Sequence, residues 1–158
     1  MDIVRTIDEI DLQILTILQD KARIPNAEVA RQVGMAPSAV LERIRKLEER
    51  GIITGYEVRL DPDPFGQGLA AFMFIEVDPT ANGSLAKRLA TLPGVQEVHQ
   101  VAGPDGYLVK IRAASPHALG EIIRDQVQVL PGVRVTRTQI VLDTIKETRR
   151  IDLDPALE

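Results

Sequence analysis

The chain has 158 residues, of which 44% are hydrophobic and 27% charged, so its composition is that of a soluble globular protein. It contains no cysteine, which excludes disulfides, thiolate catalysis and cysteine-ligated metals, and no apolar run approaches the length of a membrane span. The net charge is −4 and neither half of the chain is basic, so a surface that binds nucleic acid would have to be local. The first residues do not form a signal peptide, and we expect a cytoplasmic protein without membrane contact.

The N-terminal part of the chain has the pattern of consecutive short helices. Thr6 to Glu9 has the form of a capping box for the first helix, and apolar residues at helical spacing follow as far as Leu18. Pro25 ends that helix, because the residue before a proline disfavours the helical conformation. Asn26 is then a good N-cap for a second helix.

A third helix follows after a tight turn at residues 34–35. Pro37 suits its first turn, and Gly51 ends it in a left-handed conformation. This order of helices and turn has the spacing of a helix-turn-helix, so we predict a DNA-binding domain at residues 1–60, with an extended segment at its end. The expected buried side of the third helix is Val40, Leu41, Ile44 and Leu47.

The second half of the chain contains an internal repeat. Leu92-Pro93-Gly94-Val95 recurs as Leu130-Pro131-Gly132-Val133, and in each copy an apolar strand and a helix come before the repeated residues. The Pro-Gly pair ends the helix, and a β-rich segment follows. Two β-α-β units in tandem predict a ferredoxin-like β-α-β-β-α-β domain at residues 69–145, after a Pro- and Gly-rich linker at residues 61–68. The expected strands are residues 71–77, 95–101, 107–113 and 133–142.

The fold class is therefore α+β, a (winged) helix-turn-helix followed by a ferredoxin-like domain. The first predicted strand of that domain does not alternate between apolar and polar residues, so both of its faces should be covered. The helices of this fold cover only one face of the sheet, and a second copy of the sheet is the simplest cover for the other. Residues 146–158 are expected to form a loosely held, charged tail.

The candidate DNA-binding residues lie at exposed positions of the third helix. The N-terminal end of the second helix of a helix-turn-helix points at base edges in the major groove. Arg43 is suited to recognising guanine through two hydrogen bonds, whereas Ser38 and Lys46 are better suited to phosphate. The alternative is a solvated face held by ion pairs such as Glu42–Lys46, and the preceding helices and turn favour DNA. The predicted DNA contacts are Pro37, Ser38, Ala39, Glu42, Arg43, Arg45, Lys46 and Arg50.

Nothing in the sequence predicts catalysis or a metal site. His99 and His117 lie on different predicted elements with no second ligand nearby. Gly66 and Gly68 do not open a helix after a strand, so no phosphate-binding loop is predicted, and no nucleophile is paired with a base. We expect a protein that is not an enzyme and has no cofactor.

Several segments in a fixed order resemble a known family. They are Ile7-Asp8-Glu9-Ile10-Asp11, Gly34-Met35-Ala36-Pro37-Ser38, Arg43-Ile44-Arg45-Lys46-Leu47-Glu48, Gly51-Ile52-Ile53, Val101-Ala102-Gly103 before Tyr107, and Leu130-Pro131-Gly132-Val133 with Thr136-Arg137-Thr138. In this order and spacing they resemble the leucine-responsive regulator/AsnC (Lrp/AsnC) family, also called feast/famine transcription regulators. The resemblance covers nearly the whole chain, from about Ile7 to Lys146.

The resemblance implies a sequence-specific regulator of transcription that binds double-stranded DNA. It implies a homodimer whose C-terminal sheets pack face to face, with further assembly, commonly into an octamer that is a tetramer of dimers. An amino acid or related metabolite would bind between dimers, and it can shift assembly only through unequal affinity for two states. The effector-binding positions that match the family are Gly103, Asp105, Gly106, Thr136 and Thr138.

Two positions depart from the family pattern. Ala36 stands where members usually have serine, so the third helix lacks its usual N-cap, at a cost of about 1 kcal/mol. Gly106 stands where the loop commonly has aspartate, and Asp105 is one residue away. This departure leaves open an architectural DNA-binding protein without an effector. A second alternative is an enzyme that resembles the haem-biosynthesis decarboxylases of the same fold, which would need His or Arg around an acidic tetrapyrrole.

Overall fold

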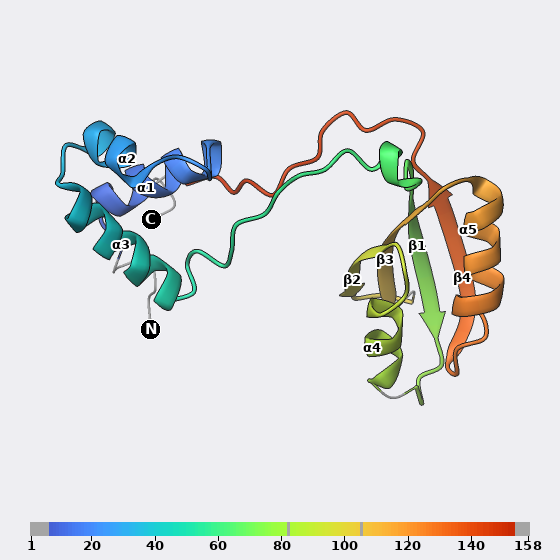
Figure 1. The fold of residues 1–158 in the computed structure, drawn as a ribbon. Helices are drawn as coiled ribbons and strands as arrows, with labels where there is room; N and C mark the ends of the chain where they lie inside the picture. Colours follow the sequence, from blue (N-terminus) through green and yellow to red (C-terminus); the bar gives the residue numbers. More distant parts are fainter. Residues whose placement is uncertain (1–6, 82, 105, 154–158) are drawn as a thin grey trace. The chain divides into compact units, whose positions relative to one another are not determined.

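The computed structural model describes residues 7–81, 83–104 and 106–153, which divide into two compact units (Figure 1). Unit 1 contains the described residues up to Val58 together with those from Glu147 onward, and unit 2 contains residues 59–146. The chain therefore leaves unit 1 and later returns to it. None of the helices in the described ranges combines the length and the apolar character needed to cross a membrane.

The helices of unit 1 are α1 (Glu9–Asp20), α2 (Asn26–Val33) and α3 (Pro37–Glu49). A capping box begins α1: the Asp8 carboxylate accepts from the Asp11 N–H at 2.8 Å, and the Asp11 carboxylate accepts from the Asp8 N–H at 3.4 Å. The capping box predicted at Thr6 and Glu9 is therefore wrong in position. Glu9 is the first residue of the helix, and Thr6 lies outside the described residues.

Apolar side chains from all three helices form the core of unit 1. Val29, Val40 and Leu47 are among its most deeply buried members, and Gly34 allows the turn between α2 and α3 with a φ of 71°. Leu41, which was predicted to face inward, is 55% exposed. Successive residues lie about 100° apart around a helix, and this places Leu41 outside the narrow buried stripe of α3. No strand is present among residues 52–60, where the sequence predicts an extended segment.

Unit 2 has the predicted β-α-β-β-α-β order, which is confirmed. Its four strands form one antiparallel sheet in the order β2-β3-β1-β4. A short 3-10 turn, η2, precedes the sheet, and a π-helical turn, η3, continues α5. The bounds are η2 (Asp63–Phe65), β1 (Leu69–Val77), α4 (Ser84–Ala90), β2 (Val95–Gln100), β3 (Tyr107–Ala113), α5 (Pro116–Ile122), η3 (Ile123–Val127) and β4 (Val133–Ile140).

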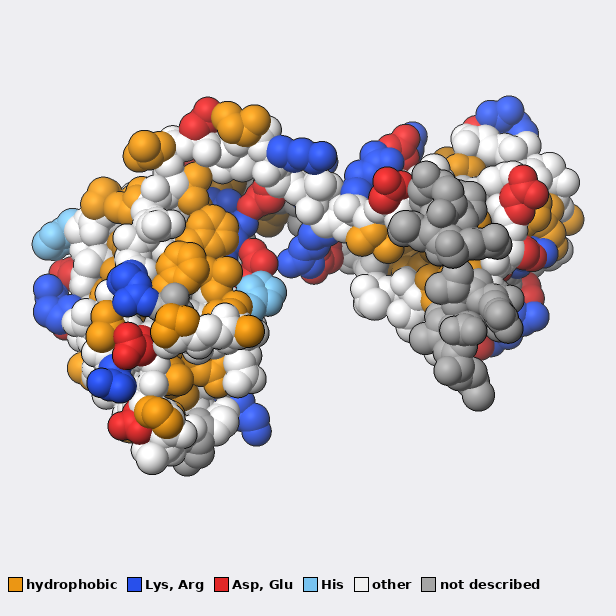
Figure 2. Space-filling model, turned by 180° about the vertical axis from the view of Figure 1, so that it is seen from behind, with side chains coloured by type: hydrophobic (Ala, Val, Ile, Leu, Met, Phe, Trp, Pro, Cys, Tyr) orange, Lys and Arg blue, Asp and Glu red, His pale blue; other side chains and the backbone are white. Residues whose placement is uncertain are grey.

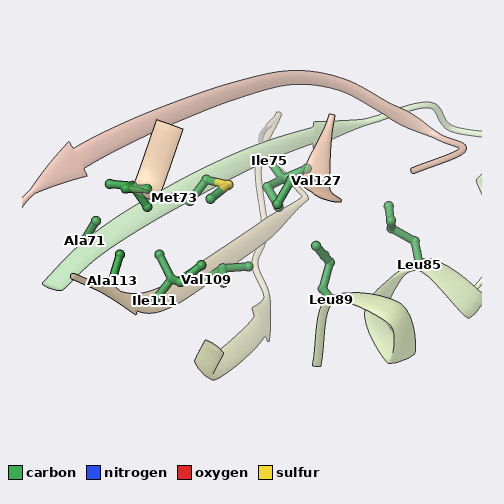
Figure 3. Packing of buried hydrophobic residues seen from close by; sticks show 10 residues of the cluster. Ala71, Met73, Ile75, Leu85, Leu89, Val109, Ile111, Ala113 and Val127 are labelled. Atoms are coloured by element: carbon green, nitrogen blue, oxygen red, sulfur yellow. The ribbon is translucent and has the colours of Figure 1, made fainter. Parts of the chain in front are cut away.

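The core of unit 2 lies between one face of the sheet and the helices. Alternate residues of the central strands β1 and β3 point toward the helices, as the period of two in a strand requires. Figure 3 shows these side chains converging with leucines from α4 and with Val127 of η3. The buried cluster consists of Ala71, Met73, Ile75, Leu85, Leu89, Val109, Ile111, Ala113, Leu119 and Val127.

Among the described residues, no helix covers the opposite face of the sheet, as expected from the sequence. Phe72 pairs with Lys110 and Phe74 with Leu108 across β1 and β3, so these four side chains share that face. Both phenylalanines are only partly buried. Figure 2 shows hydrophobic side chains gathered on the face of unit 2 that is seen from behind. An exposed apolar face of this kind is typical of a surface that binds another molecule.

Residues 147–153 lie against unit 1, and we call this segment the strap. The carboxamide of Gln19 on α1 donates to the Ile151 carbonyl at 3.0 Å and accepts from the Ile151 N–H at 2.9 Å. Arg150 lies 2.5 Å from Asp20, and Leu153 packs against the core of unit 1. The loose tail expected from the charged composition is therefore wrong for these residues, because they have specific partners on α1.

Candidate nucleic-acid interface and effector-binding loop

The outer face of α3 is the surface of unit 1 that the helix-turn-helix pattern assigns to DNA. Val40, Ile44 and Leu47 are buried beneath it, so the residues half a turn away point outward. At its N-terminal end Pro37 and Ser38 are exposed and Ala39 is half-buried. The other predicted contacts exposed on this helix and just after it are Glu42, Arg45, Lys46 and Arg50.

Ion pairs connect the charged residues of this face. The Arg45 guanidinium donates to both oxygens of Glu42, at 2.7 and 3.0 Å, and also to Glu49. The Lys46 ammonium lies 3.7 Å from Glu42. The hydrogen bond from Arg45 lowers the pKa of the Glu42 carboxyl, and in return Glu42 raises the pKa of Arg45. The ion pairs predicted by the alternative interpretation, a solvated face of the helix, are thus present. Exposed pairs of this kind contribute little stability, so phosphate groups can replace the carboxylates.

Arg43 lies apart from this network, between α3 and α1. Its guanidinium is 2.7 Å from an Asp8 oxygen and 2.8 Å from an Asp11 oxygen, and its side chain is only 30% exposed. The N–H of Asp11 and then Arg43 hold the pKa of Asp8 below its usual value. These contacts engage the group that was predicted to recognise guanine. No local pattern indicated them, because the two acids lie 32 and 35 positions away in the chain.

The N-terminus of α3 has the geometry implied by an alanine at position 36, where family members usually have serine. Ala36 is the N-cap, with extended backbone and no side-chain hydrogen bond to the helix. Pro37 occupies the first turn, where its missing N–H costs nothing. At the other end of α3, Arg50 is the C-cap and its N–H donates to the Lys46 carbonyl at 3.0 Å, and Gly51 follows with the predicted left-handed φ of 69°.

The predicted effector-binding loop is the hairpin between β2 and β3. The Val101 N–H donates to the Gly106 carbonyl at 2.9 Å, and Asp105 lies outside the described residues. Gly106 has a φ of 74°, and a Cβ at this position would lie 2.9 Å from a Val77 methyl and 3.3 Å from the Ile75 carbonyl. Both the backbone and the space therefore require glycine, so an aspartate could not occupy this position without a shift of the loop or of β1.

Thr136 lies at the same end of the sheet as this loop. Ile75 pairs with Tyr107 on one side and with Thr136 on the other, so the three residues form one row on the helix side of the sheet. The outer two are separated by two strand spacings, about 10 Å. The Thr136 hydroxyl accepts from the Gln128 amide at 3.1 Å, and Thr138 lies on the same strand and the same side, two residues further along.

A cavity of about 400 Å³ lies elsewhere in unit 2, and no predicted effector residue lines it. Asp78 and Arg88 bring opposite charges to its wall. The Asp78 carboxylate accepts from the N–H and the hydroxyl of Thr80, which lower the pKa of Asp78. The sequence pattern did not indicate this cavity, because its walls come from two separate loops and one helix. Its lining is Asp78, Thr80, Ala81, Ser84, Leu85, Arg88, Pro131 and Gly132.

The two histidines lie on separate elements, each beside a glutamate. The His99 ring nitrogen on β2 is 3.0 Å from Glu97, and that of His117 on α5 is 3.5 Å from Glu121. Both imidazoles are exposed. The structure does not bring them together.

Two family models match the chain, and together they cover both units. The model described as winged helix-turn-helix DNA-binding matches residues 7–54, and the Lrp/AsnC ligand binding domain matches residues 70–151. The chain belongs to the Lrp/AsnC family. The ligand-binding match extends into the strap, whereas the DNA-binding match covers α1, α2 and α3.

Other Lrp/AsnC proteins match this chain over almost its whole length. It is 36% identical to the HTH-type transcriptional regulator FL11 of Pyrococcus horikoshii, over 93% of this chain and 97% of that protein. It is 34% identical to the leucine-responsive regulatory protein of Escherichia coli, over 93% of this chain and 92% of that protein. The protein is accordingly a DNA-binding transcription regulator of the Lrp/AsnC family.

Solved Lrp/AsnC structures share this fold. A transcriptional regulator from Neisseria meningitidis, in complex with L-methionine, has a TM-score of 0.90 and 28% identity, covering 96% of this chain and 100% of that one. A feast or famine regulatory protein from M. tuberculosis, also complexed with L-methionine, has a TM-score of 0.86 and 33% identity, covering 92% and 99%. The predicted fold class, an α+β chain with a helix-turn-helix and a ferredoxin-like domain, is confirmed.

Proposed function

We propose that this regulator binds DNA as a homo-oligomer, with the outer face of α3 at the phosphates and the N-terminal end of α3 at the base edges. The observation that carries the proposal is the exposed network of Arg45, Lys46, Glu42 and Glu49 on the second helix of a helix-turn-helix. A regulator of this kind acts in the compartment that holds the DNA, which supports the expected cytoplasmic location.

Phosphate binding would exchange partners within this network. Arg45 and Lys46 are already exposed and face carboxylates, so a phosphate offers each of them a second anion at little structural cost. Glu42 and Glu49 repel the same phosphates, and this limits affinity for DNA of any sequence. Ser38, at the N-terminal end of the helix, is placed for a base edge or an adjacent phosphate.

The test is a salt titration of DNA binding by single variants on α3. We expect Lys46→Ala to weaken binding to cognate and random DNA by a similar factor and to reduce the slope of log affinity against log salt by about 0.9. Glu49→Gln should strengthen binding to both, because it removes a repelling charge. Glu121→Gln on α5 is the control with the same change of charge in unit 2. Unchanged salt slopes for both α3 variants would contradict the proposal.

The effector we propose is an amino acid or related metabolite. Its support is the family membership together with the L-methionine complexes of two similar structures. The proposed site is the hairpin of Gly103, Asp105 and Gly106 with Thr136 and Thr138 of β4. Backbone N–H groups of such a loop can hold a carboxylate.

A thermal-shift panel of L-methionine and the other common amino acids tests this site. A ligand at 100 times its dissociation constant stabilises the native state by about 2.7 kcal/mol, enough to raise the melting midpoint by a few degrees. We expect Thr136→Val to abolish the shift and Arg88→Ala, in the cavity wall, to retain it. The reverse result would place the effector in the cavity. The absence of any shift in the folded wild-type protein would instead support an architectural regulator without an effector.

A further inference from the structure

The strap is the part of unit 1 that lies outside the winged helix-turn-helix match, and the Lrp/AsnC ligand binding domain match ends within it, at residue 151. It reaches unit 1 from the C-terminal side of unit 2, more than 100 positions after α1 in the chain. Its backbone at Ile151 is held by the Gln19 side chain through both its N–H and its carbonyl. One amide thus reproduces the paired hydrogen bonds that two strand residues exchange in an antiparallel ladder.

Two ion pairs extend this docking at the two strap residues just before Ile151. Arg150 lies 2.5 Å from Asp20, the last residue of α1, and Arg149 lies 2.7 Å from Glu57, in the segment that leads out of unit 1. The pairs have complementary signs, with basic residues on the strap and acidic residues on the surface that receives it. Exposed pairs add little free energy singly, but they fix the register of the strap on α1.

Leu153 gives the docking an apolar anchor. It is partly buried against the same cluster that contains Val40, Ile44 and Leu47 of α3. The strap therefore contributes to the core on which the recognition helix rests. Exposed apolar residues occur just before it, at Leu142 and Ile145, so burial at Leu153 is not a general property of this part of the chain.

The strap also continues the strand that carries the proposed effector residues. β4 ends at Ile140, the Val141 N–H donates to the Ala70 carbonyl at 2.9 Å, and the strap begins at Glu147. The connection at residues 142–146 reaches at most about 18 Å when fully extended. A docked strap is thus a second tether between the units, in addition to the linker before β1.

We propose that α1 carries a docking surface, formed by Gln19, Asp20 and the adjacent core, whose partner is the strap of this chain, and that docking holds unit 1 in its DNA-binding form. The effect on DNA rests on the proposed function of α3, whereas docking itself does not. Release of the strap loosens the core under α3 and leaves unit 1 on one tether.

Hydrogen exchange on three forms of the protein tests the docking without DNA or effector. A chain that ends at Leu153 is the matched control for a chain that ends at Lys146. We expect the control to exchange like the full chain, and the shorter form to exchange roughly ten-fold faster at the amides of the C-terminal half of α1. Equal protection of α1 in all three forms would overturn the proposal.

A point variant in the full chain distinguishes the loss of docking from a general effect of truncation. Gln19→Met removes both hydrogen bonds to Ile151 at similar side-chain volume, and Gln13→Met makes the same change at an exposed position of α1. We expect faster exchange at residues 149–153 for Gln19→Met alone, and equal exchange in the two variants would count against docking.

DNA binding by the chain that ends at Lys146 should be several-fold weaker with an unchanged salt slope. Unchanged affinity with faster exchange would retain the docking surface and reject its role in DNA binding.

Discussion

At Arg43, a guanidinium that the helix pattern assigned to a base lies between the carboxylates of Asp8 and Asp11 instead. The two acids also form the capping box of α1, so a single cluster begins one helix and attaches it to another. Hydrogen bonds between charged groups are stronger than neutral ones, and Asp11 is almost fully buried. Removing the arginine leaves a buried carboxylate with fewer partners, so the substitution lowers the stability of unit 1.

We therefore expect Arg43→Ala to lower the free energy of unfolding of unit 1 by about 1 kcal/mol, after allowance for partial exposure. Its affinity for cognate and random DNA should fall by the same factor under conditions where the variant is folded. Urea denaturation and binding to both DNAs check this, with Arg45→Ala as the control that changes DNA binding but not stability. A loss confined to cognate DNA would restore Arg43 as a base contact.

The Asp8 carboxyl gives this cluster a defined dependence on pH. Its pKa in the folded protein lies below the usual 3.8, because the Asp11 N–H and Arg43 favour the ionised form. A lowered folded pKa contributes stability that is complete above pH 3.8 and is lost as the pH falls through the folded pKa. We expect the stability of the wild type to decline more steeply than that of Asp8→Asn below pH 3.8, as measured by denaturation at several pH values. Parallel curves would contradict this assignment.

At Gly106, unlike at Arg43, the structure favours the absence of a side chain. Its left-handed φ of 74° and the 2.9 Å that would separate a Cβ here from a Val77 methyl both penalise substitution. We expect Gly106→Asp to destabilise the protein by about 1 to 3 kcal/mol, although it restores the usual family residue. Gly120→Ala on α5, where a Cβ meets nothing within 4 Å, is the control and should be neutral or stabilising. A fully stable Gly106→Asp protein would show that the hairpin rearranges freely.

At the scale of elements, the repeat in the second half was the most informative part of the sequence. The Pro-Gly pairs follow shortly after the ends of two helical segments, at Ala90 and Val127, and strands of period two flank them. The order of elements in unit 2 therefore followed from local chemistry. The contacts that the sequence did not predict involve partners that are distant in the chain. Arg43 faces α1 because of acids 32 and 35 positions away, and the strap meets Gln19 across 132 positions. The positions of Leu41 and of the α1 cap failed for a local reason, since each was placed at the edge of a helical pattern.

At the scale of the whole molecule, we expect the open face of the sheet to govern assembly. Phe72 and Phe74 lie there beside Leu108, on strands whose other side is already buried. Lys110 on the same face is only 8% exposed and lies 3.9 Å from Glu97, so even its charged group is partly enclosed. A second copy of the sheet packed face to face would cover these side chains and contribute about 25 cal/mol for each Å² of apolar surface removed from water.

We expect Phe74→Glu to reduce the mass of the particle in solution to that of a monomer, because it places a charge in the centre of the proposed interface. Light scattering coupled to size-exclusion chromatography measures this mass. Leu142→Glu makes a similar change at a residue that is 96% exposed and lies after β4, and it should leave the assembly intact. Should Phe74→Glu keep the mass of the wild type, the open face would not be the dimer interface.

The return of the chain to unit 1 also sets an order of events during synthesis. The ribosome delivers α1, α2 and α3 first, then the whole of unit 2, and Leu153 only afterwards. The helix-turn-helix must therefore wait for a core residue until the sheet has been made, although domains generally fold in the order of their synthesis. If the docked strap holds unit 1 in its DNA-binding form, as we propose, a nascent chain released before the strap would present α3 on an incomplete core. We therefore expect full DNA-binding competence only in chains whose sheet domain has already been completed.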